Sequence, residues 1–398
     1  MENKNEWKKV KLKDVIDFNP KEILKKGTIA KYVEMANLQC FQKNILKYEI
    51  REYKGGTKFR NGDTLLARIT PCLENGKTGF IDFLDENEVA FGSTEYIILR
   101  EKNEVTDKNF IYYLSISEGF RNLAIKSMSG TSGRQRVQID ALLEAEIFLS
   151  PLIIQKKIAK ILSDIDSKIE LNNKINNNLE KQLQILFKKT FEERINNINT
   201  NNSKPLKELV EIIDNRGKTP PLSSENTAFP IIDVRALSGN NRILDYNNCS
   251  KYVDKEVFNT WFRNGHPQKY DILISTVGSL AELKLFFENK GCIAQNVVSI
   301  RSKKISPLYL YQYLKYIKND LISYNIGSVQ PSIKITHIIN HQIFFSDFDK
   351  INEFHKIALD TTTMIFYNSK EIQTLNQIKN YLLPKLMNGE IDIENIEL

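Results

Sequence analysis

The sequence contains few cysteines and no long hydrophobic run. Its four cysteines, Cys40, Cys72, Cys249 and Cys292, lie far apart and form no C-x-x-C pair, which argues against a zinc ribbon, a redox-active pair or a disulfide scaffold. No apolar run approaches the roughly 18 residues that a membrane-spanning helix needs, and Met1 to Lys13 lack the apolar segment of a signal peptide. We therefore expect a cytoplasmic protein with no membrane partner.

Motifs for catalysis and cofactor binding are also missing. Two G-K-T tripeptides begin at Gly76 and Gly217, but the glycine that a phosphate-binding loop needs five positions earlier is replaced by Pro71 and Ile212. The sequence has no G-x-S-x-G turn, no N-P-P-[FY] tetrapeptide and no convincing glycine-rich loop for S-adenosylmethionine. These absences predict a chain without a catalytic site.

One pair of histidines has the spacing of zinc ligands. His337 and His341 are four positions apart and would share one face of a helix, but Ile338 stands where a zinc protease has Glu, and no third ligand is evident. We therefore predict no metal site.

The charge balance leaves room for an anionic partner. Lys and Arg number 56 and Asp and Glu 49, giving a net charge of +7 over 398 residues. So small an excess suits nucleic acid without proving it. The length is comfortable for two domains of ordinary size.

The chain repeats itself with a period of about half its length. Shifting the sequence by 196 positions places Ile147 to Ser150 on Ile343 to Ser346, and the apolar positions continue to coincide as far as Leu186 and Leu382. Upstream, loops of unequal length interrupt the match. Shared framework with divergent loops is typical of two related domains that read different targets, and equally of any duplicated protein that has drifted.

Each half has a globular part followed by a helical part. Residues 1–150 and 203–346 contain Gly, Pro and Asn between short β-rich runs, which predicts mixed α/β domains. Residues 151–202 and 347–398 contain long stretches free of Gly and Pro, in which apolar residues recur at three and four positions. We expect an α+β protein with a pseudo-twofold internal repeat, two globular domains and two long helices.

The two helices are expected to pair as an antiparallel coiled coil, because each carries a stripe with a seven-residue step. Asn172 and Asn368 occupy equivalent places in these stripes, either as buried residues that fix the register or as exposed residues of an Asn-rich sequence. The predicted seam consists of Ile158, Ile165, Asn172, Leu179 and Leu186 in the first helix, and Phe354, Thr361, Asn368, Leu375 and Leu382 in the second.

Polar, basic loops follow several predicted strands and have the composition of a DNA-reading surface. Arg recognises guanine edges, Gln and Asn recognise adenine, and Lys, Ser and Thr contact phosphates, although each residue could also be a solvated turn residue. The candidates in the first half are Arg68, Thr70, Lys77, Thr131, Ser132, Arg134, Gln135 and Arg136. Those in the second half are Arg216, Lys218, Thr219, Arg235, Arg242, Ser279, Ser328, Gln330, Ser332 and Lys334.

Three stretches carry a resemblance to a known family. Residues 62–77 (GDTLLARITPCLENGK), 152–162 (LIIQKKIAKIL) and 382–391 (LLPKLMNGEI) resemble segments of the specificity subunits of type I restriction-modification systems. The resemblance covers essentially the whole chain.

The resemblance implies a function and a set of partners. Residues 1–150 and 203–346 would be target-recognition domains that read a bipartite site in double-stranded DNA. The helical regions 151–202 and 347–398 would dock two methyltransferase (M) subunits. S-adenosylmethionine would be bound by those partners, with Mg and ATP on restriction (R) subunits where restriction accompanies methylation, and this chain would hold no cofactor.

Two alternatives remain open. A fused methyltransferase or nuclease would need a catalytic motif, and a duplicated scaffold that binds only proteins would use the long helices as its active surface.

Overall fold

The computed structural model describes residues 7–393 and divides into two compact units. The first unit is formed from the residues up to Ile169 and from Gln373 onwards, and the second from Glu170–Ile372. The boundary between the units therefore falls inside both long helices. The sequence suggested a different division, in which the helical regions 151–202 and 347–398 are separate from the globular domains 1–150 and 203–346.

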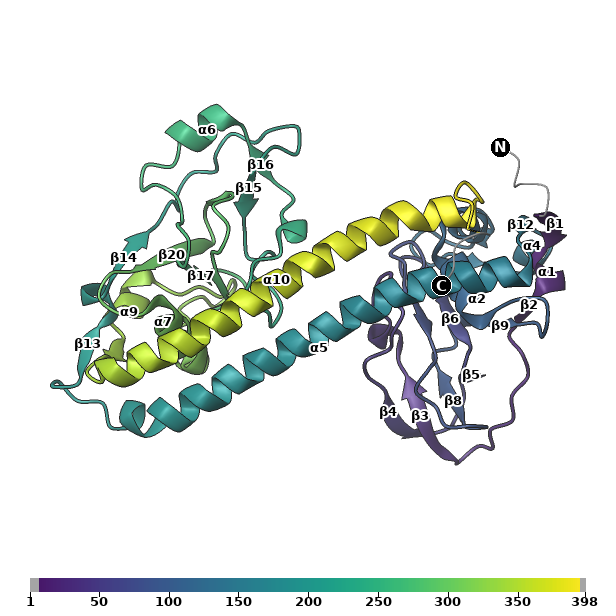
Figure 1. Cartoon of the computed structure of the whole chain (residues 1–398), viewed down its shortest axis with the longest axis horizontal. Coiled ribbons are helices and arrows are strands. Elements are labelled where there is room, and N and C mark those ends of the chain that lie inside the picture. The colour runs from purple at the N-terminus through teal and green to yellow at the C-terminus, as the bar shows by residue number, and fades with distance from the viewer. Residues whose placement is uncertain (1–6, 394–398) are drawn as a thin grey trace. The chain divides into compact units, whose positions relative to one another are not determined.

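The first unit contains two four-stranded sheets (Figure 1). The first sheet is antiparallel and has the order β2 (Ile16–Phe18), β9 (Tyr96–Glu101), β6 (Thr64–Ala67) and β7 (Thr78–Phe80). The second has the order β4 (Glu49–Glu52), β3 (Ile29–Val33), β8 (Val89–Gly92) and β5 (Thr57–Arg60), with β3 and β8 parallel. Shorter elements complete the unit: β1 (Lys8–Lys11), α1 (Leu12–Val15), the 3-10 turn Met35–Asn37, α2 (Lys108–Ile116), α3 (Glu118–Lys126), β10 (Met128–Ser129), β11 (Arg136–Val137), α4 (Ile139–Leu143) and β12 (Glu146–Leu149).

The central strand and helix of this unit follow from the local sequence. Thr64–Ala67 is buried on both faces, as expected of an apolar strand with neighbours on either side. Helix α2, which follows β9, begins at the N-cap Asp107, whose carboxylate accepts hydrogen bonds from the backbone N–H groups of Asn109 and Phe110. Its residues from Phe110 to Ile116 are buried, so the helix covers the sheet.

The second unit repeats this arrangement. Its antiparallel sheet has the order β14 (Val210–Ile213), β20 (Val297–Ser302), β17 (Ile272–Ser275) and β18 (Leu283–Leu285). Its second sheet has three strands, β16 (Tyr252–Val253), β15 (Phe229–Ile232) and β19 (Cys292–Ile293), with β15 and β19 parallel. The remaining elements are β13 (Ser203–Pro205), the 3-10 turns Leu206–Glu208 and Tyr246–Asn248, α6 (Lys255–Thr260), α7 (Pro307–Tyr316), α8 (Lys318–Ser323), α9 (Ile335–Asn340) and β21 (Gln342–Phe344).

A buried ion pair marks the same turn in both units. Asp63, just before β6, accepts hydrogen bonds from Arg100 Nε at 2.6 Å and from the Arg60 backbone N–H at 2.8 Å. Asp271, just before β17, accepts them from Arg301 Nη2 at 2.9 Å and from the Gln268 backbone N–H at 2.8 Å. The internal duplication predicted from the sequence is therefore present in the packing as well as in the strand order.

The long helices α5 (Leu152–Asn196) and α10 (Phe348–Met387) pair antiparallel within each unit (Figure 1). In the first unit, Asp166 of α5 accepts a 2.6 Å hydrogen bond from Lys379 of α10. In the second, Asn176 accepts a 2.9 Å bond from Asn368, and the rings of Phe187 and Phe354 lie 5.6 Å apart. Partners later in α5 lie earlier in α10, which confirms the predicted antiparallel pairing.

The seam is apolar at its ends and polar in its middle. Ile158 and Phe354 are buried, and Ile165, Leu179, Leu186, Leu375 and Leu382 are half-buried, as the stripe predicted. Thr361 is also half-buried, and its hydroxyl bonds to the Ile357 carbonyl of its own helix, whereas the neighbouring Thr362 is fully buried. Asn172 is buried and donates to Glu371 at 2.7 Å, whereas Asn368 donates to Asn176. The two asparagines therefore bond across the seam to different partners.

Candidate nucleic-acid interface

Two predicted loops of the first unit come together beside β6. The chain leaving β6 forms an isolated bridge between Ile69 and Arg136, and the Thr70 backbone N–H donates to the Gln135 carbonyl at 3.0 Å. The β10–β11 hairpin carries Thr131 to Arg134 at its exposed tip, where Gly130 and Gly133 adopt φ angles of 125° and 74°. We call this group loop cluster 1: Arg68, Thr70, Thr131, Ser132, Arg134, Gln135 and Arg136.

An acidic residue that the sequence did not single out lies among these cations. Glu95 accepts a 2.6 Å hydrogen bond from Arg136, and this bond lowers the pKa of Glu95. The Arg68 Nε atom is buried and has no hydrogen-bond partner within residues 7–393. Arg134 is exposed, and among residues 7–393 its guanidinium makes no hydrogen bond or ion pair. Loop cluster 1 therefore holds one cation already oriented by a carboxylate and one presented directly to solvent.

The second unit builds the equivalent loop cluster beside β17. Thr276 donates its backbone N–H to the Asn296 carbonyl and accepts from the Ile333 N–H, just as Arg68 bonds to Glu95 and Val137 in the first unit. The Gly278 N–H donates to the Pro331 carbonyl at 3.0 Å. This bond holds the loop that contains Ser328 and Gln330 next to the loop that follows β17. We call this group loop cluster 2: Arg216, Lys218, Thr219, Ser279, Ser328, Gln330, Ser332 and Lys334.

Loop cluster 2 also combines tethered and exposed side chains. Arg216 is held by Asp214 at 2.9 Å and donates to the Thr276 hydroxyl at 3.3 Å. The Thr219 hydroxyl accepts a hydrogen bond from Gln295. Lys218 and Lys334 are exposed. The two clusters share backbone positions but differ in nearly every side chain, which would let each contact a different ligand surface.

Three predicted contact residues lie outside these clusters. Lys77 is half-buried and donates to the Met35 carbonyl at 2.9 Å. Arg235 pairs with Asp233 at 2.7 Å and also bonds to Ser250. The prediction for Arg242 was wrong, because its side chain is fully buried and paired with Glu180, so it has no surface to offer DNA.

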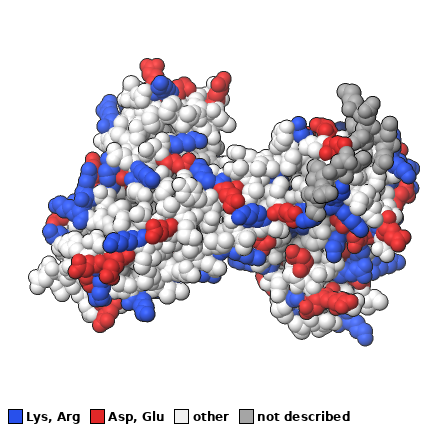
Figure 2. Space-filling view, viewed as in Figure 1, with Lys and Arg blue, Asp and Glu red and all other residues white. Residues whose placement is uncertain are grey.

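The charged surface is mixed in sign. Figure 2 shows Lys and Arg interspersed with Asp and Glu on the face drawn, without one continuous basic surface. Within residues 7–393, no group of three or more His, Cys, Asp or Glu side chains could hold a metal ion, and His341 instead bonds to the Tyr324 hydroxyl at 2.8 Å. None of the described helices has the length and hydropathy that crossing a membrane requires.

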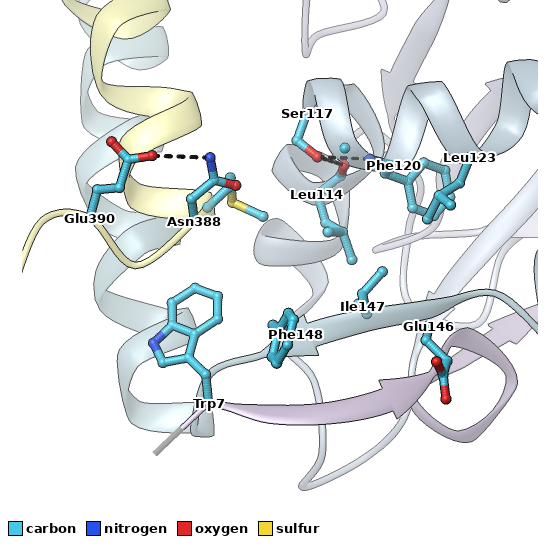
Figure 3. Close-up of a pocket in the computed structure, with 12 residues that line it drawn as sticks. Trp7, Leu114, Ser117, Phe120, Leu123, Glu146, Ile147, Phe148, Asn388 and Glu390 are labelled. Carbon is cyan, nitrogen blue, oxygen red and sulfur yellow. Dashed lines mark hydrogen bonds between the residues drawn. The ribbon is translucent and has the colours of Figure 1, made fainter. Parts of the chain in front are cut away.

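A pocket of about 470 Å³ opens in the first unit (Figure 3), and its lining includes no residue of loop cluster 1. Trp7, Phe148, Leu114 and Ser117 line it, together with the end of α10. In the second unit, Tyr316 stands on α7 where the first unit has Ser117, and its ring lies 5.8 Å from Phe187. The framework position that carries an aromatic ring in the second unit therefore carries Ser117 beside the pocket in the first.

These features define an internally duplicated protein whose two loop-bearing α/β domains are built on paired long helices. Residues 4–181 and 199–358 each match the model of the type I restriction modification DNA specificity domain, and the chain belongs to this family. The fold and the duplication predicted from the sequence agree with this membership.

Relatives and a solved structure are similar over much of the chain. The MjaIX specificity subunit of a type I restriction enzyme from Methanocaldococcus jannaschii is 26% identical over 306 residues, covering 72% of this chain and 70% of that protein. The HindI specificity subunit from Haemophilus influenzae is 31% identical over 148 residues, covering 36% of this chain and 31% of that one. The crystal structure of the type I system S subunit from M. genitalium superposes with a TM-score of 0.61 at 18% identity, covers 97% of each chain and has the same fold.

Proposed function

We propose that this chain reads a bipartite double-stranded DNA site for a type I restriction-modification complex, with one half-site bound by each loop cluster. Two M subunits would dock on the complex and methylate adenine with S-adenosylmethionine. R subunits, with Mg and ATP, would join where restriction accompanies methylation. The chain itself would contribute recognition and no catalytic group.

One observation carries the proposal: the same framework positions place a polar loop cluster beside the central strand of both units. Arg134 and Gln135 of loop cluster 1 belong to the residue types that pair with guanine and adenine edges in the major groove. The hydroxyls of Thr131 and Ser132, on the same hairpin, suit phosphate oxygens. Membership in the specificity family supports DNA as the ligand.

The proposal is tested by expressing this chain with its M subunits and mapping methylated adenines across a genome. We expect a two-part recognition sequence with an unread spacer. Arg134→Ala should relax one half-site only, since a lost bidentate base contact costs about 1–3 kcal/mol of discrimination. Lys218→Ala, in loop cluster 2, should leave that half-site intact.

Arg51→Ala serves as the matched control, because Arg51 is an exposed arginine of the same unit that pairs with Glu49 on β4, outside loop cluster 1. It should leave the recognition sequence unchanged. Uniform loss of binding with Arg134→Ala would indicate a phosphate contact instead of a base contact. Absence of any sequence-specific methylation by the assembled complex would refute the proposed function.

A further inference from the structure

A basic residue occupies the same framework position in both units: Arg242 is fully buried in the second unit, and Lys43 is half-buried in the first. The Lys43 carbonyl accepts the backbone N–H of Phe80 in β7 at 2.8 Å, and the Arg242 carbonyl accepts that of Leu285 in β18 at 2.7 Å. The residue after each forms a parallel bridge to the same strand, Asn44 with Phe80 and Ile243 with Leu285. Lys43 and Arg242 are thus equivalent in the duplicated fold, although they differ in sequence context.

Arg242 reaches from the globular part of the second unit into the seam between the long helices. Its guanidinium donates to Glu180 of α5 at 2.7 and 3.0 Å, and to the Thr362 hydroxyl of α10 at 2.8 Å. It lies 5.2 Å from the centre of the Tyr311 ring on α7. A single side chain therefore contacts both long helices and the domain helix that covers the sheet.

Glu180 is bound from two sides and is itself buried. Lys315 of α7 donates to its second carboxylate oxygen at 3.1 Å. The neighbouring Asn241 adds a 2.9 Å bond to Ser369 of α10. Burial by itself would raise the pKa of Glu180, but Arg242 and Lys315 outweigh that effect and lower it. The carboxylate is therefore held as an anion at the centre of the contact.

Lys43 makes the corresponding contact in the first unit. Its ammonium donates to Ser163 of α5 at 3.0 Å and to Asn109 of α2 at 2.9 Å. It lies 5.9 Å from the centre of the Tyr112 ring, and Tyr112 is the α2 counterpart of Tyr311. Asp166, one turn further along α5, occupies the position that Thr362 holds in α10 under the 196-residue shift.

We propose that Lys43 and Arg242 are positioning residues that fix the orientation of each loop-bearing domain on the long helices. The proposal rests on the proposed function, because orientation matters only if the loop clusters must meet two half-sites at a defined spacing. Apolar packing alone is tolerant of small rotations, whereas bidentate hydrogen bonds to a planar guanidinium are directional. A recognition surface must be held within roughly 10–20° of its productive geometry.

The test separates positioning from stability by replacing the whole ion pair. Arg242→Met alone would leave the buried Glu180 carboxylate with Lys315 but without its bidentate partner and would destabilise the unit, so the informative variant is Glu180→Gln with Arg242→Met. Neutral replacement of both partners of a buried pair is often tolerated without loss of stability. Glu288→Gln with Lys370→Met is the matched control, because that pair also links the domain to α10 but is partly exposed.

The first readout is physical and needs no DNA. Spin labels at Lys255→Cys in α6 and Glu353→Cys in α10 report the distance between the domain and the helix, in a background where the accessible Cys40 and Cys72 are replaced by Ser. We expect the double variant to melt near the parent Tm, with a distance distribution about twofold broader as the domain loses its directional bonds. The control pair should leave the distribution unchanged.

The second readout is methylation by the complex on DNA substrates whose spacer is longer or shorter by one base pair. The parent should methylate one spacer length, and the double variant should also accept its neighbours while reading the same bases. Arg242→Lys, which can keep one bond to Glu180, should restore part of the selectivity. An unchanged distance distribution together with unchanged spacer selectivity would overturn the proposal.

Failure of the proposed function would look different. In that case the parent complex would show no sequence-specific methylation, while the distance measurement would still report whether Arg242 orients the domain.

Discussion

Lengthening both long helices by seven residues is expected to lengthen the unread DNA spacer by about three base pairs. Seven residues add roughly 10.5 Å at 1.5 Å per residue, and the base-pair rise is about 3.4 Å. The insertions belong after Ile169 in α5 and after Ile372 in α10, where the two compact units divide. Seven residues preserve the heptad stripe, so each apolar face keeps its orientation.

The assay is sequencing of methylated adenines in cells that express the lengthened chain with its M subunits. Both half-sites should keep their bases while the distance between them grows. Insertion into α5 alone is the control, because it shifts the register of one helix against the other and should abolish activity. A fully active double insertion with an unchanged spacer would refute the idea that the paired helices set the spacing.

Three further outcomes follow from individual contacts. Asp63→Ala should destabilise the first unit by about 2 kcal/mol in urea unfolding, because it removes the buried acceptor of the Arg60 N–H and leaves Arg100 with the Glu22 carboxylate; a loss below about 1 kcal/mol would contradict this. Asn172→Leu should raise stability by about 1 kcal/mol, because a polar seam residue is replaced by an apolar one, and a lower Tm would refute the seam assignment. The pKa of Glu180 is lowered in the folded state, so Glu180 stabilises the second unit above its unfolded pKa of about 4.3, and this contribution is lost as the pH falls through the folded pKa. Glu180→Gln should therefore flatten the acid limb of the stability curve, measured as the urea midpoint against pH.

The framework could be predicted from the sequence because both halves of the chain repeat the same pattern of apolar residues. The 196-position shift that aligns the two halves also relates Leu152 and Phe348, the first residues of α5 and α10. Thr64–Ala67, one of the short β-rich runs of the first globular part, forms β6. Hydrophobic periodicity identifies such elements because burial on one face is a local property of the chain.

The sequence predicted which types of residue form the candidate site, but it did not predict how those residues are arranged in space. The sequence indicated that the loops after β6 and around Arg134 were polar and basic, but it could not show that the backbone of Thr70 bonds to Gln135. That contact depends on sheet topology. Glu95 was missed for the same reason, since its only signal is a carboxylate at the start of a strand.

Arg242 shows that local composition alone does not identify the residues that contact a ligand. A basic residue in a loop rich in Gly and Asn has the signature of a surface contact, yet its partner Glu180 lies 62 positions away on a helix. On α5, the polar neighbours of Glu180 in sequence, Asn177, Asn178, Lys181 and Gln182, are exposed. Only the folded chain reveals that the seam between the long helices is polar enough to accept a guanidinium.

The division of the long helices between the units has a consequence for synthesis of the protein. Leu386, Met387 and Ile393 pack in the same apolar core as Leu12 and Ile158. A chain emerging from the ribosome therefore exposes an unfinished N-terminal core throughout translation of residues 170–372. The second unit has all of its sequence available first, so the half that begins the polypeptide is expected to be the last to complete its fold.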